Sequence, residues 1–216
     1  MMVRQNRIPW SVFVFIAVVG LASTAGAQTV TVNACAAGKT RCIMGRTHVC
    51  GVVGVKGILA CHERADSRSR PVDPECLNRT TSELNECFDG LERKGGCLTT
   101  GDVGAIQDRI EAFVLEVVQQ VDPSHPALVT NRCSVGKMKA IGDATAARLE
   151  CFMDAFRGDA TIDPSCFERP LARFAYVWSK LEANGGCPTV GDIGVLDGKI
   201  DEFVAAIVTE LDPNGP

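Results

Sequence analysis

Apolar residues recur at three- and four-residue spacings through much of the chain, which is the period of an amphipathic helix. The clearest run shares one helical face between residues 103 and 121: Val103, Ile106, Ile110, Phe113, Val114, Val117 and Val121. Residues 193–211 repeat this face. A helical pattern also spans residues 134–156, and a narrower stripe of the kind that packs helix on helix spans residues 167–181. The pattern predicts an all-α protein.

The stretch that carries these helices is present twice. Residues 72–123 align with residues 162–213 at an offset of 90 without a gap, and 19 of the 52 aligned residues are identical. Several other pairs exchange one apolar residue for another, such as Ile106 for Leu196. We therefore expect a tandem duplication, with a three-helix module built twice.

Both copies carry signals for helix ends. An aspartate that can act as an N-cap precedes a proline suited to the first turn in Asp73-Pro74 and Asp163-Pro164. Glycine pairs at 95–96 and 185–186 are typical of helix stops. The last helix of each module is expected to begin with a capping box, in Thr99-x-x-Asp102 and Thr189-x-x-Asp192. Pro170 is expected to kink or delay the middle helix of the second copy.

The first helix is well marked only in the second module. Its counterpart in the first module contains four glycines, each of which costs a helix about 1 kcal/mol relative to alanine: Gly45, Gly51, Gly54 and Gly57. We align the two starts by matching Arg41-Cys42 with Arg132-Cys133, which makes Cys42 the equivalent of Cys133. The segment Cys35-Ala-Ala-Gly-Lys39 is a weaker alternative for that equivalence.

The N-terminus has the layout of a secretory signal peptide. Arg4 and Arg7 precede an apolar run over residues 10–22 and the small-residue site Ala25-Gly26-Ala27. The run is shorter than the roughly 20 residues that span a bilayer, so no integral membrane segment is expected after cleavage. The sequence thus predicts a periplasmic or extracellular protein. Its segments are a signal peptide (1–27), an N-terminal arm (28–40), module 1 (41–121), a linker (122–130) and module 2 (131–213).

Composition changes this picture in two ways. Without the leader the chain has 20 basic and 26 acidic residues, a dispersed net charge of −6 that disfavours nucleic acid or an anionic membrane as the main partner. Eleven cysteines in an exported chain point to disulfides. Each module has only about 80 residues, a size at which such bonds help to hold a small core.

Antiparallel packing of the first two helices of each module predicts the disulfide pairs. In module 2 the predicted pairs are Cys151 with Cys166 and Cys133 with Cys187. In module 1 they are Cys61 with Cys76, Cys42 with Cys97, and Cys50 with Cys87. The last pair is favoured because its two counterparts in module 2, Ile141 and Val177, are both apolar. Cys35 is left over, either as a buried or mispaired thiol or as the source of an intermolecular disulfide.

Two resemblances follow from these motifs. The cysteines at 50, 61, 76 and 87 are symmetrically spaced, with 11 residues from the outer to the inner cysteine on each side, and look like the twin C-x(n)-C helical hairpin. The wider pattern over residues 41–213 combines R-C-x-x-G-[KR], [VI]-D-P-x-C and G-G-C-x-T-x-G-D. It resembles tandem-repeat, cysteine-rich exported proteins of environmental bacteria. The resemblance implies a disulfide-stapled helical fold and no particular activity.

Candidate chemistry is sparse. The sequence contains no C-x-x-C pair for zinc or redox work and no C-x-x-C-H for haem, so no metal or cofactor is expected. His48, His62 and His125 are interpreted as ordinary surface residues, because the residues at the positions of His48 and His62 in module 2 are not metal ligands. Asp102 and Asp192 are the most prominent repeated carboxylates, and helix capping accounts for them. No Ser-His-Asp or Cys-His constellation can be proposed, so no catalytic residue is named.

These observations favour a non-enzymatic exported protein that is structural or binds another protein, with self-association as one possibility. The alternative is a carrier of an apolar small molecule or lipid between the helices. Five aromatic residues are the candidate lining of such a site: Phe113, Phe152, Phe174, Phe203 and Trp178. Ordinary core packing is the favoured interpretation of that set.

Overall fold

The computed structural model describes residues 29–45, 53–125, 131–158 and 160–214. Within these residues the chain forms seven helices and a single isolated β-bridge, which confirms the all-α prediction. The helices are α1 (Ala34–Met44), α2 (Gly54–Ser67), α3 (Pro74–Glu92), α4 (Val103–Val121), α5 (Arg132–Arg157), α6 (Ser165–Ala183) and α7 (Ile193–Leu211). No helix in this part of the chain is long and apolar enough to cross a membrane. The predicted signal peptide, His48, Cys50 and most of the predicted linker lie outside the described residues.

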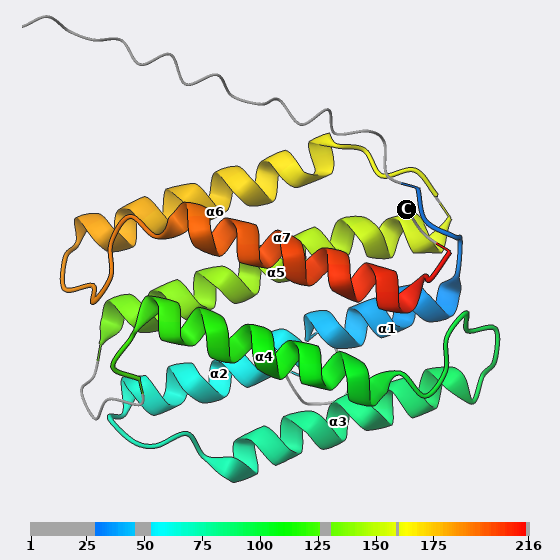
Figure 1. Cartoon of the computed structure of the whole chain (residues 1–216), viewed down its shortest axis with the longest axis horizontal. Coiled ribbons are helices and arrows are strands. Elements are labelled where there is room, and N and C mark those ends of the chain that lie inside the picture. Colours follow the sequence, from blue (N-terminus) through cyan, green and yellow to red (C-terminus); the bar gives the residue numbers. More distant parts are fainter. Residues whose placement is uncertain (1–28, 46–52, 126–130, 159, 215–216) are drawn as a thin grey trace, which may run out of the picture.

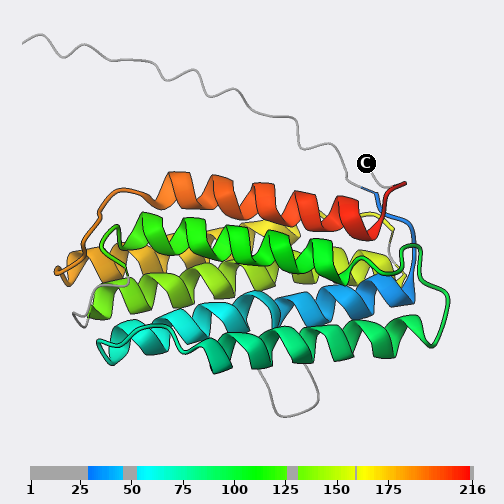
Figure 2. The ribbon, with the colours of Figure 1, turned by 60° about the horizontal axis from the view of Figure 1, so that its bottom comes forward.

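The helices form two layers (Figure 1). One layer contains α3, the end-to-end pair α1 and α2, then α5 and α6, in that order across the molecule. The second layer consists of α4 and α7, which run antiparallel and cover the middle of the first layer (Figure 2). Such an arrangement buries the apolar stripe of each helix against neighbours on two sides.

The two sequence repeats map onto equivalent helices. Helix α5 corresponds to α1 and α2 together, α6 corresponds to α3, and α7 corresponds to α4. Residues 34–44 match 132–142 at an offset of 98, whereas residues 54–67 match 144–157 at an offset of 90. The first repeat therefore contains eight additional residues, 46–53, at the point where α5 continues without interruption.

Helix α1 corrects the sequence prediction for the start of the chain. Residues 34–40 were expected to belong to an N-terminal arm, but they form most of α1, which begins after the N-cap Asn33. The arm that remains lies against the second repeat. The Val30 amide donates to Ala160 O at 2.9 Å, and the Thr31 amide donates to Asp212 Oδ2 at 2.6 Å.

Local sequence signals predicted the starts of the middle helices, α3 and α6, to within one residue. Asp73 caps α3 by accepting from the Glu75 amide at 3.0 Å, with Pro74 in the first turn, as predicted. Helix α6 begins one residue later in its repeat, and Asp163 accepts from the Ser165 amide at 2.9 Å. Pro170 lies inside α6.

The buried apolar side chains of both repeats form one continuous cluster. Phe113 of α4 and Phe203 of α7 occupy equivalent positions in the repeats, and their rings stack with centroids 4.4 Å apart. A contact between two equivalent residues places a local pseudo-two-fold axis between α4 and α7. The division into modules at 41–121 and 131–213 stays a prediction, since the repeats share one core.

Candidate functional site

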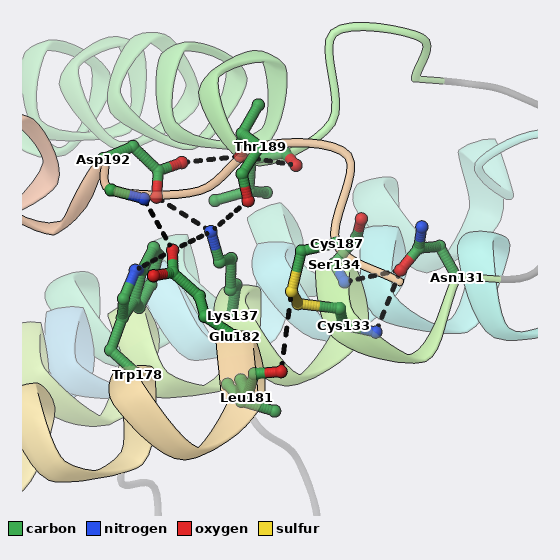
Figure 3. A network of polar contacts seen from close by, with 12 residues as sticks. Asn131, Cys133, Ser134, Lys137, Trp178, Leu181, Glu182, Cys187, Thr189 and Asp192 are labelled. Atoms are coloured by element: carbon green, nitrogen blue, oxygen red, sulfur yellow. Dashed lines mark hydrogen bonds and ion pairs between the residues drawn. A yellow bond between two sulfur atoms is a disulfide. The ribbon is translucent and has the colours of Figure 1, made fainter. Parts of the chain in front are cut away.

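The most elaborate polar site is built around a buried lysine in each repeat. In the second repeat, Lys137 of α5 is fully buried, with 0% of its surface exposed. Its ammonium group donates to Asp192 Oδ1 at 2.8 Å, to Glu182 Oε1 at 2.9 Å and to the Thr189 carbonyl at 2.8 Å (Figure 3). An ammonium group has three N–H donors, so these three acceptors satisfy it completely.

The acceptors of Lys137 are themselves held in place. The Thr189 hydroxyl donates to Asp192 Oδ2 at 2.6 Å, and the Trp178 indole donates to Glu182 Oε1 at 2.9 Å. The same indole ring lies under the lysine, with 4.4 Å between Nζ and the ring centroid. Glu182 also accepts from the Gly191 amide at 3.0 Å, which ties the loop before α7 to α6.

The first repeat reproduces this arrangement. Lys39 of α1 is 1% exposed and lies 2.7 Å from both Asp102 Oδ1 and Glu92 Oε1. It also donates to the Thr99 carbonyl at 2.9 Å, and its Nζ lies 5.1 Å from the centroid of the Phe88 ring. We call each set of one lysine, two carboxylates and one threonine carbonyl a lysine clamp. The first clamp joins α1, α3 and the loop before α4, and the second joins α5, α6 and the loop before α7.

A seven-residue motif, N-x-C-x-x-G-K, positions each lysine. It occupies residues 33–39 and 131–137. The asparagine caps the helix and its side-chain amide donates to the carbonyl of Gly96 or Gly186. The glycine leaves room for a leucine of the neighbouring helix, because a Cβ at Gly136 would lie 2.5 Å from Leu181 Cδ2. The helix then carries the lysine one turn beyond the cysteine, over the loop that supplies the aspartate.

The motif also reassigns the disulfides of the first repeat. Cys35, not Cys42, is the equivalent of Cys133, because Cys35 bonds to Cys97 as Cys133 bonds to Cys187. The predicted Cys42–Cys97 pair and the unpaired Cys35 are therefore wrong. The alternative alignment on Cys35-Ala-Ala-Gly-Lys39 is the correct one. It was not preferred because it requires an insertion of eight residues in the first repeat.

Cys42 bonds to Cys87 instead, so the predicted Cys50–Cys87 pair is also wrong. The second repeat has Ala140 and Val177 at the positions of Cys42 and Cys87. The remaining predicted pairs, Cys61–Cys76, Cys133–Cys187 and Cys151–Cys166, are confirmed. Five disulfides thus use ten of the eleven cysteines, and Cys50, outside the described residues, is the eleventh.

The repeated aspartates have a different role from the one predicted. Asp102 and Asp192 lie at the N-cap positions of α4 and α7, but neither side chain makes a capping hydrogen bond. Their carboxylates bind the buried lysines instead. Burial alone would raise the pKa of Asp192, but hydrogen bonds from Lys137 and Thr189 outweigh it and lower the pKa below its ordinary value. The expectation of a capping box is therefore wrong, because a buried cation is a stronger partner for a carboxylate than a backbone amide.

The clamps have the chemistry of structural sites. All three donors of Lys137 are engaged, so its nitrogen has no lone pair with which to attack a substrate or form a Schiff base. Asp192 is buried against the ammonium group, whereas the side chain of Glu182 is 22% exposed. The N–H donors and the ring contact of each ammonium group are satisfied within the protein.

A second polar site occurs only in the first repeat. His125, after α4, has its Nδ1 2.7 Å from Asp66 Oδ1, and its Nε2 3.1 Å from Nδ1 of His62 on α2. We call these three residues the histidine chain. The side chains of Asp66 and His125 are buried and His62 is half-buried, so the interpretation of His62 and His125 as ordinary surface residues is wrong. The repeat pattern in the sequence did not reveal the histidine chain, because the second repeat has no equivalent polar pair.

Burial perturbs the groups of the histidine chain. Burial, with a smaller contribution from nearby His125, lowers the pKa of His62 to about 4. Burial also raises the pKa of Asp66. Asp66 Oδ2 has no hydrogen-bond partner. In the second repeat the positions of His62 and Asp66 are taken by Phe152 and Phe156, which belong to the core.

Neither polar site has the donor set of a metal centre. Among the described residues no cluster of three or more His, Cys, Asp or Glu side chains could hold a metal ion. The aromatic residues that could line an apolar ligand site are all buried, and two pairs of them are in ring contact: Phe113 with Phe203 and Phe174 with Trp178.

Comparisons with known proteins identify no relative of this chain. No family model, no curated protein and no solved structure matches it.

Proposed function

We propose that this chain is an exported, non-enzymatic protein that binds another protein chain through the outer face of α6. The observation that carries the proposal is a difference between two helices that the fold treats as equivalent. Helices α3 and α6 have the same place in the two repeats and equivalent clamp residues, and each is joined by an equivalent disulfide, through Cys76 or Cys166. Their outer faces are nonetheless unlike.

Helix α6 exposes an aromatic side chain where α3 exposes a charged one. Tyr176 is 60% exposed, and its equivalent in α3 is the exposed Glu86. Leu171 is 45% exposed at the margin of the side of α6 that carries the buried Trp178, and its equivalent is the half-buried Thr81. Only Phe174 and Trp178 are buried in α6, whereas four residues are buried in α3. The α3 face is evidence that the fold does not require apolar residues at these positions. Exposed apolar residues that the fold does not require are typical of a binding surface.

The remaining features agree with a binding role. The buried charges of both clamps have partners inside the protein, and five disulfides hold the helices, so the surface is presented by a rigid frame. Rigid surfaces lose little conformational entropy on binding. The export of the chain, its periplasmic or extracellular location and its lack of catalysis belong to the same proposal.

The test is native mass spectrometry of the mature protein isolated from its own host. We expect a complex with a second protein chain, and we expect that complex to be lost in the double variant Leu171→Ser, Tyr176→Ser. The matched control is Leu115→Ser, because Leu115 is also exposed but lies on α4. A wild-type protein that is always a single chain with no bound partner would contradict the proposal.

The alternative role as a carrier of an apolar ligand has a separate test. The contacts among the aromatic rings favour core packing over a ligand lining. A carrier would show co-purifying lipid in the native mass spectrum and a higher melting temperature with fatty acids. We expect neither result.

A further inference from the structure

The outer faces of α3 and α6 carry opposite charge. Outside the clamp residue Glu92, α3 has four acidic residues and one basic residue, a net charge of −3: Glu75, Glu83, Glu86 and Asp89 against Arg79. Outside the clamp residue Glu182, α6 has three basic residues and one acidic residue, a net charge of +2: Arg169, Arg173 and Lys180 against Glu168. Opposite potentials of this kind on two exposed faces favour their association.

The sign reverses at one pair of equivalent positions, since Glu83 of α3 corresponds to Arg173 of α6. Elsewhere a charge is present in one helix only: Lys180 corresponds to Gly90, and Glu86 and Asp89 correspond to Tyr176 and Ser179. Arg79 and Arg169 are the one shared basic position. The backbone of the two helices has the same role in the fold, so packing within the chain does not account for the change of sign.

The two faces lie on opposite edges of the molecule. Helix α3 forms one edge of the first layer and α6 forms the other (Figure 1). The two faces of one molecule cannot meet each other, but the α6 face of one copy can meet the α3 face of the next. A contact between two different faces is heterologous, and it continues from copy to copy as a ring or a filament.

We propose that the partner of the α6 face is the α3 face of a second copy of this chain, so that the protein assembles head to tail. The inference rests on the proposed function and names the partner. Arg173 and Lys180 meet the acidic row of Glu83, Glu86 and Asp89, which sets the orientation. Tyr176, on the same side of α6 as Arg173 and Lys180, adds apolar contact area.

The experiment is sedimentation velocity of the mature protein over a range of concentrations at low and at high salt. We expect the weight-average mass of the wild type to rise to at least two copies at low salt and to fall at high salt, because exposed charges are screened. Arg173→Glu and Glu83→Arg should each weaken association by about tenfold or more, since each places like charges together.

The two charge-reversal variants provide an internal rescue. When they are mixed in equal amounts, the introduced glutamate of one variant faces the introduced arginine of the other. Their unchanged faces also match, so association should return. Arg68→Glu is the matched control because it makes the same change of charge at an exposed residue, the C-cap of α2, and it should associate as the wild type does. A mixture that stays monomeric, or an effect of Arg68→Glu equal to that of Arg173→Glu, would overturn the assembly.

The outcome separates this inference from the proposed function. If the wild type is monomeric at every concentration and salt, yet native mass spectrometry finds a different protein bound in a manner that depends on Leu171 and Tyr176, then head-to-tail assembly is wrong and the binding role stands. If the protein is monomeric and also binds no other chain, both proposals are wrong.

Discussion

At the scale of single residues, the lysine clamps are the most demanding feature of this protein. Removing a charge from water costs several kcal/mol, and a buried ion pair offsets that cost only when its geometry satisfies every donor. Lys39 and Lys137 meet this condition with two carboxylates, a carbonyl and an aromatic ring each. Because the clamps recur in both repeats, we attribute to them the fixed position of the loops before α4 and α7.

Replacing one lysine should therefore be costly. Lys137→Met leaves Asp192 and Glu182 without their cation and should lower the free energy of unfolding by about 3–5 kcal/mol, measured by urea denaturation. Lys139→Met is the matched control. Lys139 is 66% exposed and pairs with Asp143 on the surface, so its loss should cost about 0–1 kcal/mol. Equal effects of the two substitutions would contradict a structural role for the clamp.

The histidine chain should make stability depend on pH. The folded-state pKa of His62, about 4, lies below its ordinary 6.5, so the unfolded chain binds a proton in this range that the folded chain does not. The free energy of unfolding should therefore fall by about 1–3 kcal/mol as the pH drops from 6.5 towards 4. The raised pKa of Asp66 acts in the opposite direction and reduces the net slope.

The variant His62→Phe isolates the histidine. It introduces the residue found at the equivalent position, Phe152, and removes the titrating group. Urea denaturation between pH 4 and 7 should show a flatter profile for the variant than for the wild type. Identical profiles would show that His62 does not contribute. A separate loss of stability is expected at lower pH, near 3.8 and below, as Asp192 becomes protonated and its clamp is broken.

At the scale of helices, the sequence predicts a helix correctly when the residues that mark its ends and its apolar face lie close together along the chain. Helices α3, α4, α6 and α7 have their caps, stops and apolar faces within a few residues, so their positions followed from the repeat. The break between α1 and α2 did not. The alignment of Arg41-Cys42 with Arg132-Cys133 matched similar letters, whereas the true register is fixed by contacts 63 residues apart, between Lys39 and Asp102 and between Asn33 and Gly96.

The clamps were missed for the same physical reason. Asp102 and Asp192 are visible in the sequence as repeated carboxylates. Their lysines align with each other only when residues 46–53 are treated as an insertion in the first repeat. The one available signal was the shared Cys-x-x-Gly-Lys of residues 35–39 and 133–137. Charged residues that agree in both repeats at otherwise apolar helix positions would have indicated a buried pair.

The junction between α1 and α2 offers a test at this scale. Gly54 begins α2 with φ +58°, and a Cβ there would lie 2.2 Å from Ile43 O. Gly54→Ala should therefore lower the free energy of unfolding by about 1–3 kcal/mol, through strain and the displacement of α1 from α2. Gly104→Ala is the control, since Gly104 lies in α4 with open space around it and should be neutral or gain up to about 1 kcal/mol. Thermal unfolding of both variants measures the difference.

At the scale of the whole molecule, the two similar halves of the chain share one core. Equivalent phenylalanines stack across the pseudo-two-fold axis, and ion pairs join α4 to α7, such as Arg109 with Glu210. The repeats agree where the fold needs them, at the clamps and at two disulfides. They differ at the insertion before Gly54, the Cys42–Cys87 disulfide, the histidine chain, and the outer faces of α3 and α6. Those differences are where we place the properties particular to this protein.

The register of α1 and α2 against α5 underlies the equivalence of the two lysine clamps and of the N-x-C-x-x-G-K motif. Peptide mapping of the non-reduced protein after alkylation of free thiols tests it most directly. The structure predicts peptides that link Cys35 to Cys97 and Cys42 to Cys87, with Cys50 as the single alkylated cysteine. Peptides that link Cys42 to Cys97 and Cys50 to Cys87, with Cys35 alkylated, would contradict the register and the conclusions that depend on it.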